Sequence, residues 1–362
     1  MANKLEEARK MINEVDSQMA QLFVKRMRAV EAVCEYKMEF GLPILDQARE
    51  DAVIEKNSAL VEDDVLKGYY IDYLKNLMSL SRAYQYRMQS GLKIAYSGVE
   101  GAFAHIAAGR IFPQGNRVSY SDFKAAYDSV LNGESDVAVL PIENSYAGEV
   151  GQTMDLIFSG CLYINGIYEL EIHQNLLGLP DASIDDIKKV TSHPQALSQC
   201  HDYIQMRGFE AEESNNTALA AKLVAESNDR SLAAIASVET AEIYGLKVIE
   251  ANINKSGENT TRFAVLSKVK ANSPAMTSTV LMFTVKHESG SLANAIGIIA
   301  KYGYNMTALR SRPMKKDSWQ YYFYVEIDDT TDTKIGNIML EELNNVCDRL
   351  KVAGTFKPHT EI

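Results

Sequence analysis

The first 90 residues carry their apolar side chains at the spacing of α-helices. From Leu5 onward, apolar positions follow one another in steps of three and four with no Gly or Pro between them, which predicts a long helix with a coiled-coil-like seam. Gly41 and Pro43 end this pattern, and Asp46 stands at the expected N-cap of a second helix. Residues 65–89 carry a third helical pattern. The first helix, at about 35 residues or roughly 50 Å, is too long for its companions to cover, so we expect a partner chain to cover it.

After residue 92 the pattern changes to short apolar runs that alternate with helical stretches. We expect strands at residues 93–97, 117–120, 136–140, 190–192, 210–213, 232–236, 248–253 and 259–266, and helices at 102–111, 123–131 and 218–225 and from 152 and 193 onward. This alternation predicts an α/β fold, here in two lobes like a periplasmic binding protein. Ligands of such sheets lie at the carboxyl ends of the strands. The last two strands are expected to return to the first lobe.

The C-terminal part shows the order βαββαβ. Strands are expected at residues 279–287, 306–313, 320–327 and 352–356, and helices at 292–302 and 332–350. This order predicts an antiparallel, ferredoxin-like α+β sheet with both helices on one face. A polar connector at residues 268–277 precedes it, so we predict three domains: 1–90, 92–268 and 277–358.

Composition narrows the classes of function. The net charge of −11 argues against nucleic acid or a membrane surface as a partner, since both favour a basic face. The first ten residues mix charges of both signs, and apolar runs such as residues 292–300 are too short to span a bilayer. We therefore expect a cytoplasmic chain. Its four cysteines form no CxxC pair, so neither a disulfide framework nor a metal site is expected, and no cofactor is required. The absence of GxGxxG disfavours a nicotinamide dehydrogenase.

Several polar residues of the helical region are candidates for an active site. Arg26 and Lys37 continue the apolar seam of the first helix; such side chains either extend to water or point into a pocket between helices. Asp46, Arg49 and Glu50 share one face of the second helix. Together these residues resemble the active-site set of the all-helical chorismate mutases, which here comprises Arg9, Arg26, Lys37, Asp46, Arg49, Glu50, Ser81 and Gln85.

The resemblance implies an intertwined homodimer in which Arg9 reaches the partner's site. Chorismate rearranges to prephenate without a nucleophile or base, so the protein contributes a compact conformer and charge stabilisation. Arg9, Arg26 and Arg49 would hold the two carboxylates, while Lys37 and Gln85 would be the catalytic donors to the breaking ether oxygen. Glu50 and Asp46 would meet the hydroxyl or hold the arginines, although Asp46 could be only a helix cap, and the role of Ser81 is open.

Three motifs in residues 92–268 resemble those of prephenate dehydratases: residues 141–145 (PIENS), 192–195 (SHPQ) with Gln199, and 261–263 (TRF). The resemblance makes Thr261 the key hydroxyl, acting as a donor to the leaving oxygen, and places Glu143 and Asn144 in the catalytic set. Asn144, Ser192, Gln199 and Thr217 would bind prephenate. Arg262 would pair with a substrate carboxylate or form a structural salt bridge. His193 and Glu143 could titrate near neutrality, and His193 could instead cap its helix.

The C-terminal region resembles an ACT regulatory domain. Two segments occupy the places that sense phenylalanine in one subgroup, and the effector residues implied are Gly290, Ser291, Leu292, Ser311, Arg312 and Pro313. Arg310 stands where that subgroup usually carries an acid. The alternative is a domain that only dimerises the enzyme through its exposed strand edge.

The leading interpretation is a bifunctional isomerase and carbon–oxygen lyase of phenylalanine biosynthesis. It would convert chorismate to prephenate and then to phenylpyruvate, with phenylalanine as feedback inhibitor. One alternative is a mutase fused to a non-catalytic ligand sensor, and another is a mutase whose dehydratase has decayed. The homodimer would form through the helical and ACT domains, and whether dimers join into tetramers is left open.

Overall fold

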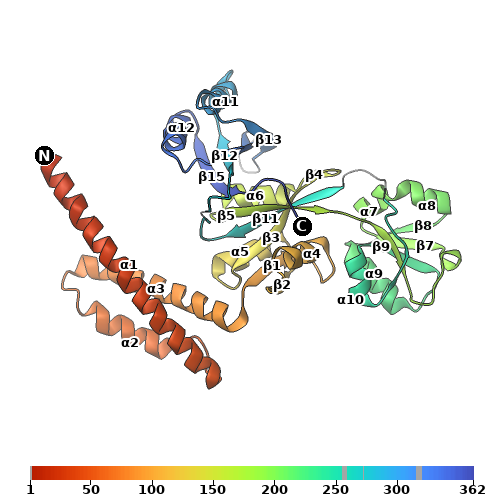
Figure 1. Ribbon diagram of the computed structural model, residues 1–362, viewed down its shortest axis with the longest axis horizontal. Coiled ribbons are helices and arrows are strands. Elements are labelled where there is room, and N and C mark those ends of the chain that lie inside the picture. Colours follow the sequence, from red (N-terminus) through yellow and green to blue (C-terminus); the bar gives the residue numbers. More distant parts are fainter. Residues whose placement is uncertain (1, 255–258, 272, 315–319) are drawn as a thin grey trace. The chain divides into compact units, whose positions relative to one another are not determined.

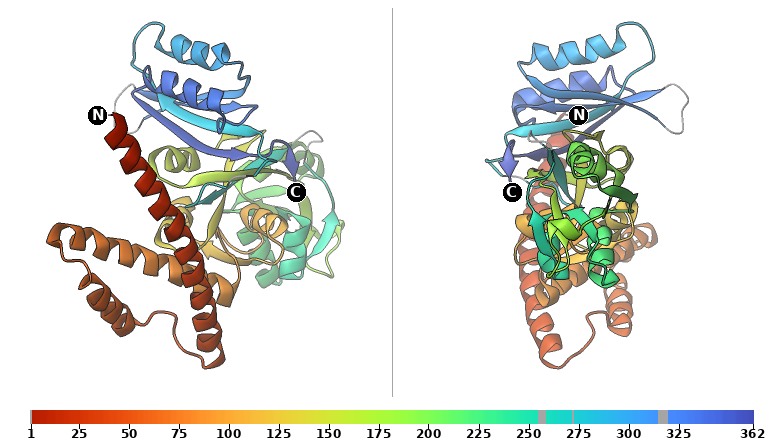
Figure 2. Two further views of the ribbon diagram at one scale, coloured as in Figure 1. Left: turned by 60° about the vertical axis from the view of Figure 1, so that its left-hand side comes forward. Right: turned by 90° about the vertical axis from the view of Figure 1, so that its right-hand side faces the viewer.

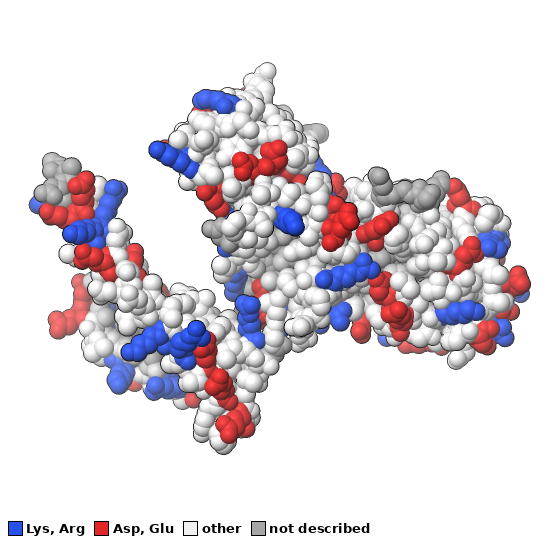
Figure 3. Space-filling view, in the orientation of Figure 1, with Lys and Arg blue, Asp and Glu red and all other residues white. Residues whose placement is uncertain are grey.

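The computed structural model describes residues 2–254, 259–271, 273–314 and 320–362. They fall into two compact units, Met1–Leu92 and Lys93–Ile362. Within those ranges, no helix combines the length and apolar character needed to cross a membrane. On the face shown in Figure 3, acidic and basic side chains are interspersed over both units.

The first unit is a three-helix array. It contains α1 (Ala2–Glu39), α2 (Gln47–Ser58) and α3 (Asp64–Ser90) (Figure 1). Asp46 is the N-cap of α2, with its carboxylate accepting a hydrogen bond from the Arg49 backbone N–H at 3.0 Å. Asp63 caps α3 in the same way. These carboxylates satisfy N–H groups that a helix start leaves unpaired.

The seam of α1 is largely uncovered within one chain. Its apolar positions Leu5, Ile12, Val15, Met19 and Leu22 remain between 42% and 63% exposed. The buried apolar side chains of this unit gather instead where α1 and α2 meet α3, at Cys34, Ile44, Leu74 and Met78. Helix α1 is therefore longer than α2 and α3 can cover within one chain, as predicted.

Within the described residues, the first sheet of the second unit contains eleven strands. Its order is β13 (Met306–Pro313), β14 (Tyr321–Ile327), β12 (Ser278–Thr284), β15 (Arg349–Phe356), β5, β11, β3, β1 and β2, with β4 attached to β3 and β16 (Thr360–Glu361) attached to β5. The strands from the dehydratase-like region are β1 (Lys93–Ser97), β2 (Asn116–Tyr120), β3 (Val137–Asn144), β4 (Gly148–Glu149), β5 (Tyr163–Glu171) and β11 (Thr260–Ser267). Helices α4 (Phe103–Ile111), α5 (Phe123–Asn132) and α6 (Gly151–Ser159) accompany them. Strands β1, β2 and β3 are parallel, whereas β11 runs antiparallel to both β3 and β5.

A second, five-stranded sheet has the order β10-β6-β9-β7-β8. Its strands are β6 (Asn175–Gly178), β7 (Lys189–Ser192), β8 (Glu210–Glu213), β9 (Leu232–Ala236) and β10 (Lys247–Glu250). Around it lie α7 (Pro194–Gln199), α8 (His201–Arg207), α9 (Thr217–Ser227) and α10 (Val238–Tyr244) (Figure 1). All five residues of β9 are buried, as expected for a central strand.

One expectation about this sheet is wrong. The strand predicted at residues 248–253 was expected to return to the first lobe, but β10 pairs antiparallel with β6 and stays in the second sheet. Only β11 returns. Strands β5 and β6 were not predicted at all.

The C-terminal sheet follows the predicted βαββαβ order. It contains β12 (Ser278–Thr284), α11 (Ser291–Lys301), β13 (Met306–Pro313), β14 (Tyr321–Ile327), α12 (Lys334–Asn344) and β15 (Arg349–Phe356), followed by β16 (Thr360–Glu361). Helices α11 and α12 lie on the same face of this sheet (Figure 2). The helix predicted over 332–350 is shorter, because β15 begins at Arg349.

Strand alternation gives the C-terminal sheet two different cores. Leu281 and Phe283 pack with the helices, whereas Val280 and Met282 join the core of the dehydratase-like sheet. The two parts also share a sheet edge, since Gly354 of β15 pairs with Ile164 of β5. A Cβ at Gly354 would lie 2.0 Å from the Ile164 carbonyl oxygen, so this approach requires glycine.

Two candidate active sites

The first site is a cavity of about 360 Å³ between the three helices of the first unit. Seven of the eight predicted mutase residues line it: Arg26, Lys37, Asp46, Arg49, Glu50, Ser81 and Gln85. Arg9 does not, and it lies on the exposed part of α1. Arg26 and Lys37 thus point into a pocket between helices, which was one of the two alternatives for these seam cations.

Hydrogen bonds fix the cavity side chains. Arg26 donates to the Ser81 hydroxyl at 2.5 Å, and the Lys37 ammonium donates to the Ile44 carbonyl oxygen at 2.5 Å. Gln85 is buried, its Nε2 lies 3.4 Å from the Ser81 carbonyl oxygen, and its Oε1 has no hydrogen-bond partner among the described residues. A buried amide with unused capacity is poised to bind a ligand.

Arg82 is a cavity residue that the sequence analysis missed. Its guanidinium forms an ion pair with Glu50, and it lines the same cavity. The signal was present, because Arg82 precedes Gln85 by three residues and therefore shares a face of α3 with it.

The second site is a cavity of about 350 Å³, lined by β3 and β11 of the first sheet and by α7 and α9, which accompany the second sheet. Asn144 ends β3 and lies opposite Thr261 of β11 in the strand register. The Asn144 Nδ2 donates to the Thr261 Oγ1 at 3.0 Å. Because Thr261 accepts this bond, its own hydroxyl hydrogen remains available to a ligand in the cavity.

A chain of side-chain amides joins the end of β3 to α7 across this cavity. Gln195 donates to Asn144 at 3.1 Å, and Asn144 donates to Asn259 at 2.8 Å. Asn259 then donates to the Gln199 Oε1 at 3.0 Å, and Gln174 donates to the same oxygen at 3.2 Å. Gln174, Gln195 and Asn259 were not predicted as site residues. Asn259 could have been found, because it lies two residues before Thr261 and so faces the same way.

The N-termini of three helices, which carry the positive ends of the helix dipoles, line this cavity. The starts of α4, α7 and α9 contribute Phe103, His193 and Thr217 to its wall. Among the described residues, the cavity wall includes no Lys or Arg. A carboxylate bound here would therefore meet helix N–H groups and their dipoles.

His193 is the N-cap of α7. Its Nδ1 accepts a hydrogen bond from the Gln195 N–H at 3.2 Å, which requires an unprotonated Nδ1. Burial lowers the pKa of His193, and the negative charge of Glu213 only partly opposes this shift. Neutral His193 thus orients the segment that carries Gln195.

Strand alternation separates the other predicted dehydratase residues. Asn144, Gln199, Thr217 and Thr261 line the cavity, whereas Glu143, Ser192 and Arg262 do not. Ser192 is fully buried and donates to the Ile235 carbonyl oxygen at 2.5 Å. Glu143 and Arg262 lie opposite each other in the register, on the reverse face of β3 and β11.

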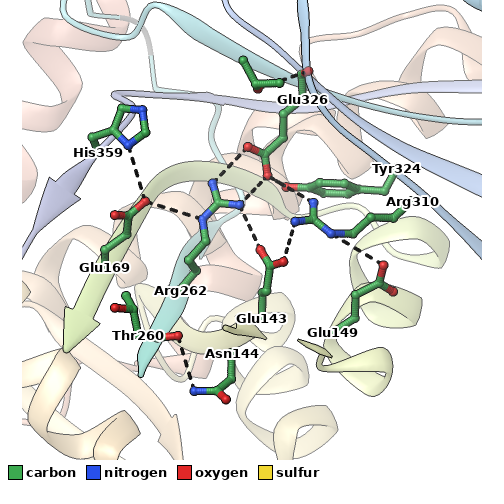
Figure 4. A network of polar contacts seen from close by, with 11 residues as sticks. Glu143, Asn144, Glu149, Glu169, Thr260, Arg262, Arg310, Tyr324, Glu326 and His359 are labelled. Atoms are coloured by element: carbon green, nitrogen blue, oxygen red, sulfur yellow. Dashed lines mark hydrogen bonds and ion pairs between the residues drawn. The ribbon is translucent and has the colours of Figure 1, made fainter. Parts of the chain in front are cut away.

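Arg262 is therefore a salt-bridge residue, and its predicted role as a prephenate ligand is corrected (Figure 4). It donates to both Glu326 oxygens, at 2.8 and 3.0 Å, and to Glu143 at 3.2 Å. Although burial opposes its charge, these hydrogen bonds raise the pKa of Arg262. Burial raises the pKa of Glu326, but the hydrogen bonds from Arg262 and Tyr324, together with the positive charges of Arg262 and Arg310, outweigh burial and lower this pKa overall.

The predicted effector residues divide between the two faces of the C-terminal sheet. A hollow of about 340 Å³ lies near the start of α11 and is lined by Leu292, Tyr321 and Phe323 among others. Ser311 and Pro313 pair with Phe323 and Tyr321 in the strand register and so belong to this face, and Gly290 and Ser291 begin α11. Arg312 faces the other way, with its Nε 3.4 Å from Asp155.

Two protein families match this chain: "Chorismate mutase type II" over residues 8–86 and "Prephenate dehydratase" over residues 94–271. Curated relatives described as bifunctional chorismate mutase/prephenate dehydratase match almost the whole length. The relative from Aquifex aeolicus is 30% identical and covers 98% of this chain and 98% of its own. The relative from Buchnera aphidicola subsp. Schizaphis graminum is 30% identical and covers 98% and 96%.

Solved structures resemble the second unit. The prephenate dehydratase from Staphylococcus aureus is 26% identical with a TM-score of 0.65, covering 73% of this chain and 100% of that one. GqqA, described as a quorum quenching acylase, is 28% identical with a TM-score of 0.68, covering 73% and 97%. The prephenate dehydratase from Arthrobacter aurescens, solved with L-Phe, shares the fold at 24% identity and a TM-score of 0.68, covering 73% and 89%.

Proposed function

The chain belongs to the bifunctional chorismate mutase/prephenate dehydratases of phenylalanine biosynthesis, and we propose that its two cavities are the two active sites. The observation that carries this proposal is the mutase cavity. Seven residues named from sequence meet there around one hollow, which a ligand sensor would not need.

In the first cavity the protein binds the reactive conformer of chorismate and stabilises the charge that develops in the transition state. Arg26 and Arg49 hold the carboxylates of chorismate, with Arg26 braced by Ser81. Lys37 and Gln85 donate hydrogen bonds to the ether oxygen as its bond to carbon breaks. Electron pairs shift around the ring of reacting atoms, so no proton is exchanged with the protein. Holding the compact conformer lowers the entropic cost of the rearrangement.

In the second cavity prephenate loses its ring carboxylate and its ring hydroxyl. The bond from the ring to the carboxylate breaks, carbon dioxide leaves, and the electron pair enters the ring. The bond from the ring to oxygen breaks as the ring becomes aromatic, and the departing hydroxide takes a proton to form water. The free hydroxyl hydrogen of Thr261 stabilises that oxygen, and the N-terminus of α9 at Thr217 binds the carboxylate that remains.

The partner chain and the effector complete the proposal. The exposed seam of α1 is covered in a homodimer, which brings Arg9 of the partner subunit to the mutase cavity. The C-terminal part is an ACT domain, and phenylalanine binds on the face that carries Leu292, Ser311 and Phe323. The relative from Arthrobacter aurescens solved with L-Phe supports this choice of effector.

Two substitutions test whether the sites are separate. Lys37→Ala should lower mutase activity more than about a hundredfold, because a transition-state donor is lost, and should leave dehydratase activity intact. Thr261→Ala should do the reverse. Both activities are measured on each purified variant, with chorismate or prephenate supplied as substrate. Loss of both activities from either change in a folded chain would refute two separate sites.

A further inference from the structure

The reverse face of the dehydratase strands is held by the C-terminal sheet. In β3 and β11, Asn144 and Thr261 face the cavity, while their chain neighbours Glu143 and Arg262 face the opposite way. Figure 4 shows Glu143 and Arg262 meeting Arg310 of β13 and Glu326 of β14. One peptide bond therefore separates each cavity residue from an ion-paired residue.

Glu326 anchors Arg262 with both oxygens. The two hydrogen bonds measure 2.8 and 3.0 Å, and the Glu326 side chain is 5% exposed. The Tyr324 hydroxyl donates a further bond to Glu326 at 2.7 Å. A bidentate pair of this kind fixes orientation as well as distance.

Arg310 anchors Glu143 from the neighbouring strand. Its Nη2 lies 2.5 Å from Glu143, its Nε lies 3.6 Å from Glu149, and its guanidinium lies 5.5 Å from the centre of the Tyr324 ring. Four carboxylates, of Glu143, Glu149, Glu169 and Glu326, surround the guanidiniums of Arg262 and Arg310. Loss of either arginine would leave neighbouring carboxylates to repel one another in a half-buried setting.

We propose that Arg310 and Glu326 are positioning residues for the dehydratase reaction. By holding Glu143 and Arg262 on one face of β3 and β11, they set the distance between Asn144 and Thr261 on the other face. The C-terminal sheet thus controls the orientation of the Thr261 hydroxyl without entering the cavity. The inference rests on the proposed dehydratase site at Asn144 and Thr261.

The experiment compares Glu326→Gln and Arg310→Gln with a matched control, Glu342→Gln. Glu342 lies on α12 of the same C-terminal sheet domain and accepts hydrogen bonds from Lys301 and Tyr302, away from the ion pairs of Arg262 and Arg310. Steady-state kinetics with prephenate should show kcat lowered about tenfold or more in both Glu326→Gln and Arg310→Gln, since small displacements of reacting groups are costly. The KM for prephenate should change less than twofold, and the control should match the unmodified chain.

Conservative variants separate positioning from general destabilisation. Arg310→Lys and Glu326→Asp keep the charge and should recover part of the kcat that the glutamine variants lose. The Arg310 side chain is 21% exposed, more than the 5% of Glu326, so its substitution disturbs folding less. The Arg310 variants therefore test the proposal if Glu326→Gln fails to fold. Unchanged kcat in folded Arg310→Gln would overturn the proposal, as would an equal loss in Glu342→Gln.

Thr261→Ala distinguishes this inference from the site assignment beneath it. If Thr261→Ala leaves dehydratase activity unchanged, the site itself is wrong and the positioning proposal falls with it. If Thr261→Ala abolishes activity while the Arg310 and Glu326 variants remain fully active, only the positioning proposal is refuted.

Discussion

At the residue scale, Thr261 and Arg262 are chain neighbours with different surroundings. Thr261 lines the second cavity, whereas Arg262 forms ion pairs with Glu143 and Glu326. In a strand they must face opposite ways, but polar residues on both sides of β11 conceal which face is the cavity. The C-terminal sheet decides this, because its Glu326 covers the face of Arg262.

The environment of His193 predicts that the stability and the dehydratase activity of the chain depend on pH. Its pKa is lowered by burial, so it lies below the usual value of about 6.5. When the pH falls below about 6.5, His193 binds a proton in the unfolded chain before it does so in the folded chain, so the free energy of unfolding decreases. Above this pH His193 is neutral in both states and does not change the free energy of unfolding. Protonation of the folded chain would end the bond from the Gln195 N–H.

We therefore expect dehydratase kcat/KM to fall only below about pH 6.5. His193→Asn keeps an N-cap acceptor and should remove this acidic fall, as measured by pH–rate profiles with prephenate. The mutase profile of the same variant is the control, and it should be unchanged. An identical acidic fall in His193→Asn would contradict the role of His193 as the titrating cap.

The ion pair between Arg82 and Glu50 predicts that loss of Arg82 weakens the binding of chorismate to the mutase site. Without its partner, Glu50 is free to pair with Arg26 or Arg49 and to compete with the substrate carboxylates. Arg82→Met should therefore raise the KM for chorismate about tenfold with a smaller change in kcat. Arg28→Met is the matched control, because Arg28 pairs with Glu31 at an exposed position of α1. An unchanged KM in Arg82→Met would show that the pair with Glu50 does not matter.

At the element scale, helix and strand periodicity predicted most of the fold. The three helices, most of the buried strands of both sheets and the βαββαβ order follow from spacing and caps. Strands β5 and β6 and helix α10 were not predicted, and β10 was assigned to the wrong sheet. The place of each of these three strands depends on which distant strand it pairs with, and local periodicity does not report that pairing.

The exposed seam of α1 predicts sharing of mutase sites between chains. Arg9→Ala and Lys37→Ala should each be inactive alone, because each removes one cation from every site. When the two chains are co-expressed with different tags, random pairing should restore about one quarter of the mutase activity, since half of the dimers regain one intact site. Purification through both tags isolates the mixed dimers. Mixed dimers without mutase activity would contradict a site completed by Arg9 of the partner subunit.

At the scale of the whole molecule, the sequence separated the mutase and dehydratase regions but understated how closely the C-terminal part joins the dehydratase. The polar connector predicts a third domain at residues 277–358. In the structure β15 of this region pairs with β5, and Val280 and Met282 enter a core shared with the dehydratase strands. Such a shared core depends on which face of β12 meets which neighbour, and periodicity alone does not report that.

The most direct measurement supplies the purified chain with chorismate alone and follows chorismate, prephenate and phenylpyruvate over time, with and without millimolar phenylalanine. We predict that chorismate disappears, that phenylpyruvate forms without any added cofactor, and that phenylalanine slows its formation. Accumulation of prephenate with no phenylpyruvate would contradict the dehydratase assignment and leave the second unit as a binding module.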